Sequence, residues 1–153
     1  MLIVKQERPP FYKALSKYLP DFHEHGTCVY GGILYNWAGV ELTTEWIAHE
    51  EEHAKQMTSY HTGEGYINLP PKLRVEEWWK RYLRSDSFRL SQELPAMQRE
   101  LWVYQMVEKD REKLLQKKID IARRLKHPMY GERISAQQIL KLLDSDRLVN
   151  FRV

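Results

Sequence analysis

Two histidines and a glutamate in the segment HEEEH, at positions 49–53, have the residue types and spacing of a metal site. On an α-helix, His49 and His53 stand one turn apart on a single face, where their imidazole rings can bind one zinc ion together. Glu50 is turned about 100° from His49 around the helix, so its carboxylate can reach a water on the metal rather than the metal itself. Zinc lowers the pKa of such a water toward about 7, which lets a nearby carboxylate act as general base. The H-E-x-x-H pattern therefore predicts metal-assisted hydrolysis.

The surrounding sequence predicts the helix that this motif needs. Thr43 can cap the N-terminus, and no Gly or Pro interrupts the run before Gly63, which supplies a stop. One side of this helix is lined by Trp46, His49, His53, Met57 and Tyr60. We therefore expect both histidines to lie on an inward-looking face. The alternative is a solvated face, on which Glu51 and Lys55 form an ordinary i,i+4 ion pair.

Length and composition are those of a globular protein. The 153 residues are 42% hydrophobic and 29% charged, and we expect one domain over residues 1–153. A net charge of +3 does not by itself indicate nucleic acid, although the segment after Val107 is more basic. Cys28 is the only cysteine, which excludes a disulfide framework and a cysteine-based zinc site. The N-terminal run MLIVKQERPP predicts neither a signal peptide nor a membrane span, so we expect a cytoplasmic protein without a membrane partner.

The first part of the chain predicts only short elements. Residues 1–4 are either a short strand or a frayed end, and Phe11 to Tyr18 form a short amphipathic helix that Pro20 ends. The HEH sequence at 23–25 could place two histidines on one face of a strand. It has no third ligand nearby, so we interpret it as a polar turn.

Residues 28–43 form the best β segment. Val29 to Tyr35 favour strands, and residues 36–39 predict a turn before a second extended stretch at 40–42. Gly31 and Gly32 interrupt the segment. They either make a bulge or permit close backbone approach at an open edge, where an extended peptide could bind by strand addition.

The remainder predicts helices. We expect them over residues 76–83, 87–107 and 108–126, and from a capping box at Ser135 and Gln138 through Leu143. Connections are expected at 62–65 and 127–131, and residues 144–153 show no pattern. Trp78, Trp79 and Tyr82 recur at helical spacing, which is more typical of core packing than of nucleic-acid stacking. Pro95 would kink the second of these helices or begin it. The Lys and Arg residues of the third are expected to be solvated.

A third ligand has to come from farther along the chain, because a catalytic zinc ion takes three protein ligands. A metzincin would continue the motif with a glycine and a third histidine, at positions that Gln56 and Ser59 occupy here. A His2Glu set instead takes a glutamate from a later helix. Glu93 fits best by its position after His53, and Ala96 on the same side leaves room for a facing helix. The alternatives are Glu76, Glu77 and Glu100.

Three segments together resemble a known family. HEEEHAKQM, WWKRYLRSDSFRLSQELPAM and MYGERIS are similar to the small phage and prophage metallopeptidase-like proteins, compact zincins of the gluzincin type. The resemblance covers most of the chain and implies an α+β fold, with a short sheet before the H-E-x-x-H helix and a mostly helical remainder. It implies one zinc ion per chain, and the ligands and general base that it assigns are His49, His53, Glu93 and Glu50. Pro95 and Met97 depart from the family pattern, and both lie close to Glu93.

These inferences predict a zinc-dependent metallopeptidase of phage or prophage origin that acts on a peptide or protein substrate. The candidates for an additional oxyanion donor are Tyr60, His61, Tyr104, His127 and Tyr130. The main alternative is a catalytically inactive zincin-fold module with a binding or regulatory role. A nucleic-acid binder that uses the basic segment after Val107 is a third and less favoured hypothesis.

Overall fold

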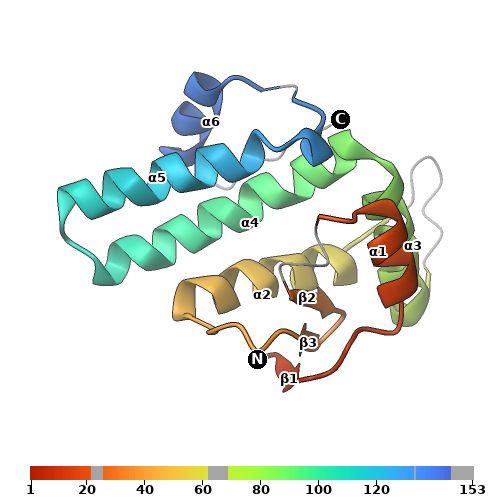
Figure 1. Cartoon of the computed structure of the whole chain (residues 1–153). Helices are drawn as coiled ribbons and strands as arrows, with labels where there is room; N and C mark the ends of the chain where they lie inside the picture. Colours follow the sequence, from red (N-terminus) through yellow and green to blue (C-terminus); the bar gives the residue numbers. More distant parts are fainter. Residues whose placement is uncertain (22–25, 62–68, 133, 146–153) are drawn as a thin grey trace. The chain divides into compact units, whose positions relative to one another are not determined.

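A small sheet and a mostly helical remainder make up the computed structural model, which describes residues 1–21, 26–61, 69–132 and 134–145 (Figure 1). The strands are β1 (Ile3–Lys5), β2 (Thr27–Tyr30) and β3 (Ile33–Asn36). The helices are α1 (Tyr12–Tyr18), α2 (Thr44–Thr58), α3 (Pro71–Arg84), α4 (Asp86–Val107), α5 (Arg111–Leu125) and α6 (Ala136–Leu143), with a 3-10 turn η2 (Pro128–Tyr130). The expected α+β class is confirmed. The expected turns at 23–25 and 62–65, the stop at Gly63 and the tail from residue 146 lie outside the described residues.

The described residues form two compact units that share helix α2. One unit contains the sheet, α1, α2 from Glu50 onward, and α3. The other contains the first turns of α2 through His49, together with α4, α5 and α6. Helix α2 is itself a single run from Thr44 to Thr58, so the unit boundary falls within one regular helix. The expectation of one domain over the whole chain stays a prediction.

The sheet has the strand order β1-β3-β2, with β1 parallel and β2 antiparallel to β3. The short strand expected within residues 1–4 is found at residues 3–5, where Ile3 pairs with Ile33. Gly31 and Gly32 form the tight turn between β2 and β3, so the interpretation as a bulge within one strand was wrong. Gly31 has a φ of +62°, a backbone conformation that tight hairpin turns need and glycine adopts without steric cost.

After β3 the chain closes the predicted turn but does not form another strand. The side-chain amide of Asn36 donates to the Val40 carbonyl and its oxygen accepts from the Val40 N–H, each at 2.9 Å. These two bonds occupy the backbone N–H and carbonyl of Val40, the first residue of the expected stretch. No strand forms at 40–42 in the described structure.

Aromatic side chains build the core of the first unit. Trp79 on α3 packs against Phe11 with ring centroids 4.2 Å apart, and its indole N–H donates to the Val29 carbonyl at 3.2 Å. The predicted helical trio of Trp78, Trp79 and Tyr82 is buried. The expectation of core packing for these rings is confirmed. The Gly31 N–H points to the Met57 sulfur at 3.4 Å, which ties the hairpin turn to α2.

In the second unit, α4 and α5 run antiparallel and side by side, with α6 against α5 (Figure 1). Leu94, Leu101 and Ile121 lie in one buried apolar cluster that joins these helices. The predicted capping box at the start of α6 is confirmed. The Ser135 hydroxyl accepts from the Gln138 N–H, and the Gln138 side chain accepts from the Ser135 N–H. The positions of the four later helices follow the expected ranges, although α3 begins earlier than expected, at Pro71.

Pro95 lies inside α4 and does not begin it. A proline has no N–H, so it cannot donate to the carbonyl of Ser91 one turn earlier. The helix nevertheless continues from Asp86 to Val107, and Pro95 is buried within it. Although α4 has 22 residues, neither it nor another described helix is long and apolar enough to cross a membrane.

One glycine precedes the β-hairpin and another follows it, and the pair allows a test of how closely a neighbour packs against each. Gly26 and Gly39 both have positive φ, at 78° and 65°. A Cβ on Gly26 would lie 2.1 Å from the Ala38 Cβ, whereas nothing lies within 4 Å of one on Gly39. We expect Gly39→Ala to lower the free energy of unfolding by about 1 kcal/mol, and Gly26→Ala by about 2–4 kcal/mol. Urea denaturation of both variants measures this; equal losses would contradict the contact with Ala38.

The buried thiol of Cys28 predicts a dependence of stability on pH. Burial, and to a smaller extent the charge of Glu50, raise the pKa of Cys28 well above its usual value. The unfolded chain loses this proton near pH 8.5 while the folded chain keeps it, so the free energy of unfolding falls as pH rises further. The loss is up to about 1.4 kcal/mol per pH unit. Urea titrations between pH of about 7.5 and 9.5 should show a smaller loss for Cys28→Ala than for the wild-type chain; parallel losses would refute the prediction.

Candidate metal centre

Helix α2 places the two motif histidines as the spacing predicts. The N–H of Trp46 donates to the Thr43 hydroxyl oxygen at 3.4 Å, which is the expected N-cap contact. His49 and His53 follow one turn apart, and their exposed fractions are only 3% and 5%. The inward-looking face is therefore confirmed for both rings, and the solvated alternative is excluded for them.

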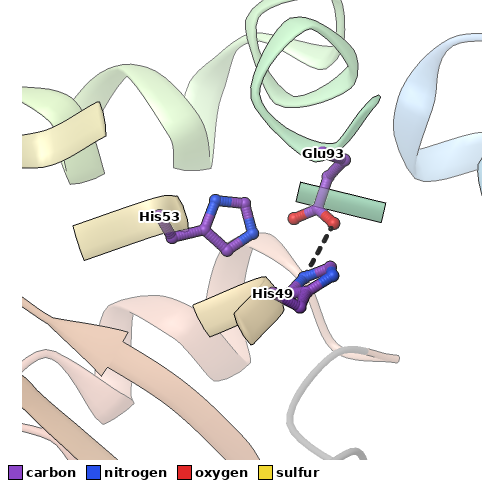
Figure 2. Close-up of side chains that lie close together, drawn as sticks. All are labelled: His49, His53 and Glu93. Carbon is purple, nitrogen blue, oxygen red and sulfur yellow. Dashed lines mark ion pairs between the residues drawn. The ribbon is translucent and has the colours of Figure 1, made fainter. Parts of the chain in front are cut away.

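Glu93 on α4 lies beside these rings, as Figure 2 shows. Its Oε2 atom is 3.5 Å from His49 Nε2, and one ligand atom from each of His49, His53 and Glu93 lies within 4.8 Å of the others. Two donors about 2.1 Å from a tetrahedral zinc ion are about 3.4 Å apart. His49 and Glu93 already have this separation. The three residues form a buried group that could hold a metal ion.

His49 and Glu93 belong to the same compact unit, and His53 follows His49 by one turn of an unbroken helix. Glu93 is itself buried, with an exposed fraction of 4%. Choosing Glu93 as the third member of the group is therefore supported by the residues around it.

Glu100 contacts the other nitrogen of His49. Its Oε2 atom lies 3.2 Å from His49 Nδ1, while His49 Nε2 points toward Glu93. A carboxylate can only accept, so this contact favours a proton on Nδ1 and leaves Nε2 available to a metal ion. Glu100 was a weaker candidate for the third ligand. It lies at the site, but on the opposite side of the His49 ring from Glu93.

Two cations on α5 hold the Glu100 carboxylate. Lys117 Nζ is 2.8 Å and Arg124 Nη2 is 2.7 Å from its Oε1 atom. The expectation that α5 only exposes its Lys and Arg residues was wrong for this pair, because a carboxylate with 1% exposure needs a compensating charge. Burial by itself raises the pKa of Glu100, but the hydrogen bond and charge of His49, with Arg124 and Lys117, outweigh it. The pKa of Glu100 therefore lies well below its usual range.

Other side chains orient the two rings. His53 Nδ1 is 2.8 Å from Gln56 Oε1, an atom that can only accept, so Nε2 of His53 is the nitrogen left for a metal. Trp46 stacks on His49 with ring centroids 4.9 Å apart and an interplanar angle of 10°. His53 meets Trp78 edge-on at 5.7 Å. Each ring thus has a polar contact at Nδ1 and an aromatic neighbour.

Glu50 is not one of the three grouped residues, as expected for a residue that does not bind the metal directly. It is buried on α2, and its charge contributes to the raised pKa of Cys28 on β2. Glu50 therefore lies within electrostatic reach of the β2 strand. Its role as general base stays a prediction.

The remaining candidates have other surroundings. Glu77 pairs with Lys80 at 2.6 Å on α3, and neither it nor Glu76 joins the described metal-binding group. Among the suggested oxyanion donors, His127 accepts at Nδ1 from the Met129 N–H at 3.3 Å, and His61 is exposed. Tyr130 is buried, and burial followed by the charge of Glu93 raises its pKa well above the usual value.

Sequence reasoning missed the residues that support the histidines. They are Gln56, Lys117 and Arg124, together with the position of Glu100 behind His49. A signal for part of this was present. Lys117 and Arg124 are two turns apart, flanking Ile121 on the apolar face of α5, and Glu93 and Glu100 have the same separation on α4.

Comparisons with protein-family models, with curated proteins and with solved structures find no match for this chain.

Metal analysis tests the group directly. Purified wild-type protein supplied with zinc should hold one zinc ion per chain by elemental analysis, and His49→Ala and Glu93→Gln should each lose it. Glu77→Gln is the matched control, because it removes a glutamate that is not part of the group and should retain full zinc. Circular dichroism confirms that each variant is folded. Full zinc in folded Glu93→Gln would remove Glu93 from the ligand set.

Proposed function

We propose that this chain is a zinc-dependent metallopeptidase in which His49, His53 and Glu93 hold the metal and Glu50 is the general base. The observation that carries the proposal is the convergence of two imidazoles and one carboxylate, with His49 Nε2 only 3.5 Å from Glu93 Oε2. Two histidines and a glutamate are the ligands of catalytic zinc in His2Glu hydrolases, where the fourth position stays open. The resemblance of three sequence segments to small phage and prophage metallopeptidase-like proteins supports the same function.

Zinc is the ion that best suits these donors. Imidazole nitrogens favour zinc over magnesium or calcium, which prefer oxygen ligands, and the group contains no thiolate. When bound, the ion would polarise a peptide carbonyl and lower the pKa of a water molecule in the open position. Two nitrogens and one carboxylate would hold it with a net charge of +1, which preserves this polarising effect.

The residues of the chain would supply the proton transfers. Glu50 lies next to His49 in sequence but faces a different direction around α2, and it is not one of the three grouped residues. It would accept a proton from the attacking water at a carboxylate oxygen and pass that proton to the leaving amine. The buried surroundings of Glu50 would strengthen its electrostatic interaction with the reacting groups.

A structural zinc site is the second candidate. The observation in its favour is burial, because each of the three grouped side chains has an exposed fraction of 5% or less. A closed site contributes its binding free energy to folding, and such a chain would serve as a binding or regulatory module. A chelator that unfolds a protein without measurable hydrolytic activity would support this candidate over the peptidase.

Replacing the Glu50 carboxylate distinguishes the metallopeptidase from the structural zinc site. Glu50→Gln should retain one zinc per chain but lower hydrolysis of a mixed fluorogenic peptide library by about 10²–10⁴-fold, since a glutamine cannot accept the proton. Glu52→Gln is the control, because Glu52 is buried on the same helix and pairs with Lys55. Unchanged turnover in Glu50→Gln would remove this residue from the mechanism.

A further inference from the structure

A continuous chain of polar contacts leads from α5 to the candidate metal ligands. Lys117 Nζ and Arg124 Nη2 both contact Glu100 Oε1, at 2.8 and 2.7 Å. The second oxygen of the same carboxylate lies 3.2 Å from His49 Nδ1. Each Glu100 oxygen thus has its own set of partners, and the two cations hold the oxygen that does not face the histidine.

The cations are necessary for this arrangement because Glu100 is nearly inaccessible to water, with an exposed fraction of 1%. A buried carboxylate without a compensating charge is strongly disfavoured, so it would rotate toward solvent. That rotation would withdraw the acceptor from His49 Nδ1. A second contact runs in parallel, because Arg124 lies over the Trp46 ring at 5.8 Å and Trp46 stacks on His49.

We propose that Lys117 and Arg124 are positioning residues of the metal centre: through Glu100 they keep the His49 ring with Nδ1 protonated and Nε2 facing Glu93. Both cations would act on the metal ligands through Glu100, and together they set how tightly the centre binds zinc. The effect on zinc affinity rests on the proposed metal site, whereas the effect on the orientation of the His49 ring does not depend on a bound metal.

Coulomb repulsion alone predicts the opposite change in zinc affinity, so a measurement of affinity separates the two explanations. Lys117 and Arg124 are positive charges near a site for a cation, so removing them should strengthen zinc binding if only Coulomb repulsion mattered. If they act by positioning Glu100, removing them should weaken it. The loss of a partner behind a metal-binding histidine typically lowers metal affinity by about 10–100-fold.

Neighbouring residues of α5 provide matched controls. Lys118 pairs with Asp144 and Arg123 pairs with Asp120, so neither depends on Glu100. We would compare Lys117→Met/Arg124→Met with Lys118→Met/Arg123→Met, because both double variants remove the same charge from the same helix. The single variants Lys117→Met and Arg124→Met, and the conservative Lys117→Arg, complete the set and provide folded material if the first double variant does not fold.

Zinc affinity is measured by competition with a chromophoric chelator. We expect zinc dissociation constants about 10–100-fold higher for Lys117→Met/Arg124→Met, intermediate values for the single variants, and values within about twofold of wild type for the control pair and for Lys117→Arg. Unchanged or tighter zinc binding in the folded variants lacking these cations would overturn the claim that the two cations support the centre.

A spectroscopic measurement on metal-free protein tests the positioning step by itself. The ring N–H of His49 is buried and lies beside the Glu100 carboxylate, so its ¹H–¹⁵N resonance should be protected from solvent exchange and observable. The signal is assigned by its absence from His49→Ala. It should be lost or shifted in Lys117→Met/Arg124→Met and retained in the control pair. If the variants show this pattern but the wild-type chain binds no zinc, the metallopeptidase is refuted and the positioning of His49 is supported. A signal that is the same in Lys117→Met/Arg124→Met, the control pair and the wild type would refute the positioning.

Discussion

The cost of burying ionisable groups is the constraint on which this site depends. His49, His53, Glu93 and Glu100 each expose 5% of their surface or less. Charges removed from water in this way cost several kcal/mol each unless other groups compensate them. The structure meets the cost by distributing partners over three helices. α2 supplies the imidazoles, α4 the carboxylates and α5 the cations.

Apolar packing determines which polar groups meet. Leu94 and Leu101 on α4 pack in the same cluster as Ile121 on α5, and this contact sets the register of the antiparallel pair. Glu100 lies next to Leu101 in the sequence, and Lys117 and Arg124 lie one turn on either side of Ile121. The same side-chain packing that excludes water therefore aligns the carboxylate with its two cations. Hydrophobic burial and charge compensation support each other here.

Local patterns account for what could be predicted. The H-E-x-x-H spacing, the capping box at Ser135 and the aromatic spacing of Trp78 and Trp79 each depend on residues within one or two turns, so the sequence contains them directly. The contacts that escaped prediction join residues far apart in the chain. Lys117 reaches Glu100 only because α4 and α5 pack in one register. Lys117 and Lys118 are both partly buried lysines, and their residue type alone does not show which of them reaches Glu100. The hairpin at Gly31 was missed because the pairing of β2 with β3 decides between a turn and a bulge, and local sequence does not show that pairing.

Pro95 has a further mechanical consequence for α4. Because it cannot donate to the Ser91 carbonyl, the helix has a gap in its backbone ladder two residues after Glu93. Bending a helix at such a gap disrupts fewer bonds than bending an intact one. Glu93 lies within the turn of α4 that spans this gap. A metal ion held by this group would therefore meet one donor on a segment that bends at lower cost and two rings on a regular helix, so selectivity among divalent ions would depend on donor chemistry more than on cavity size.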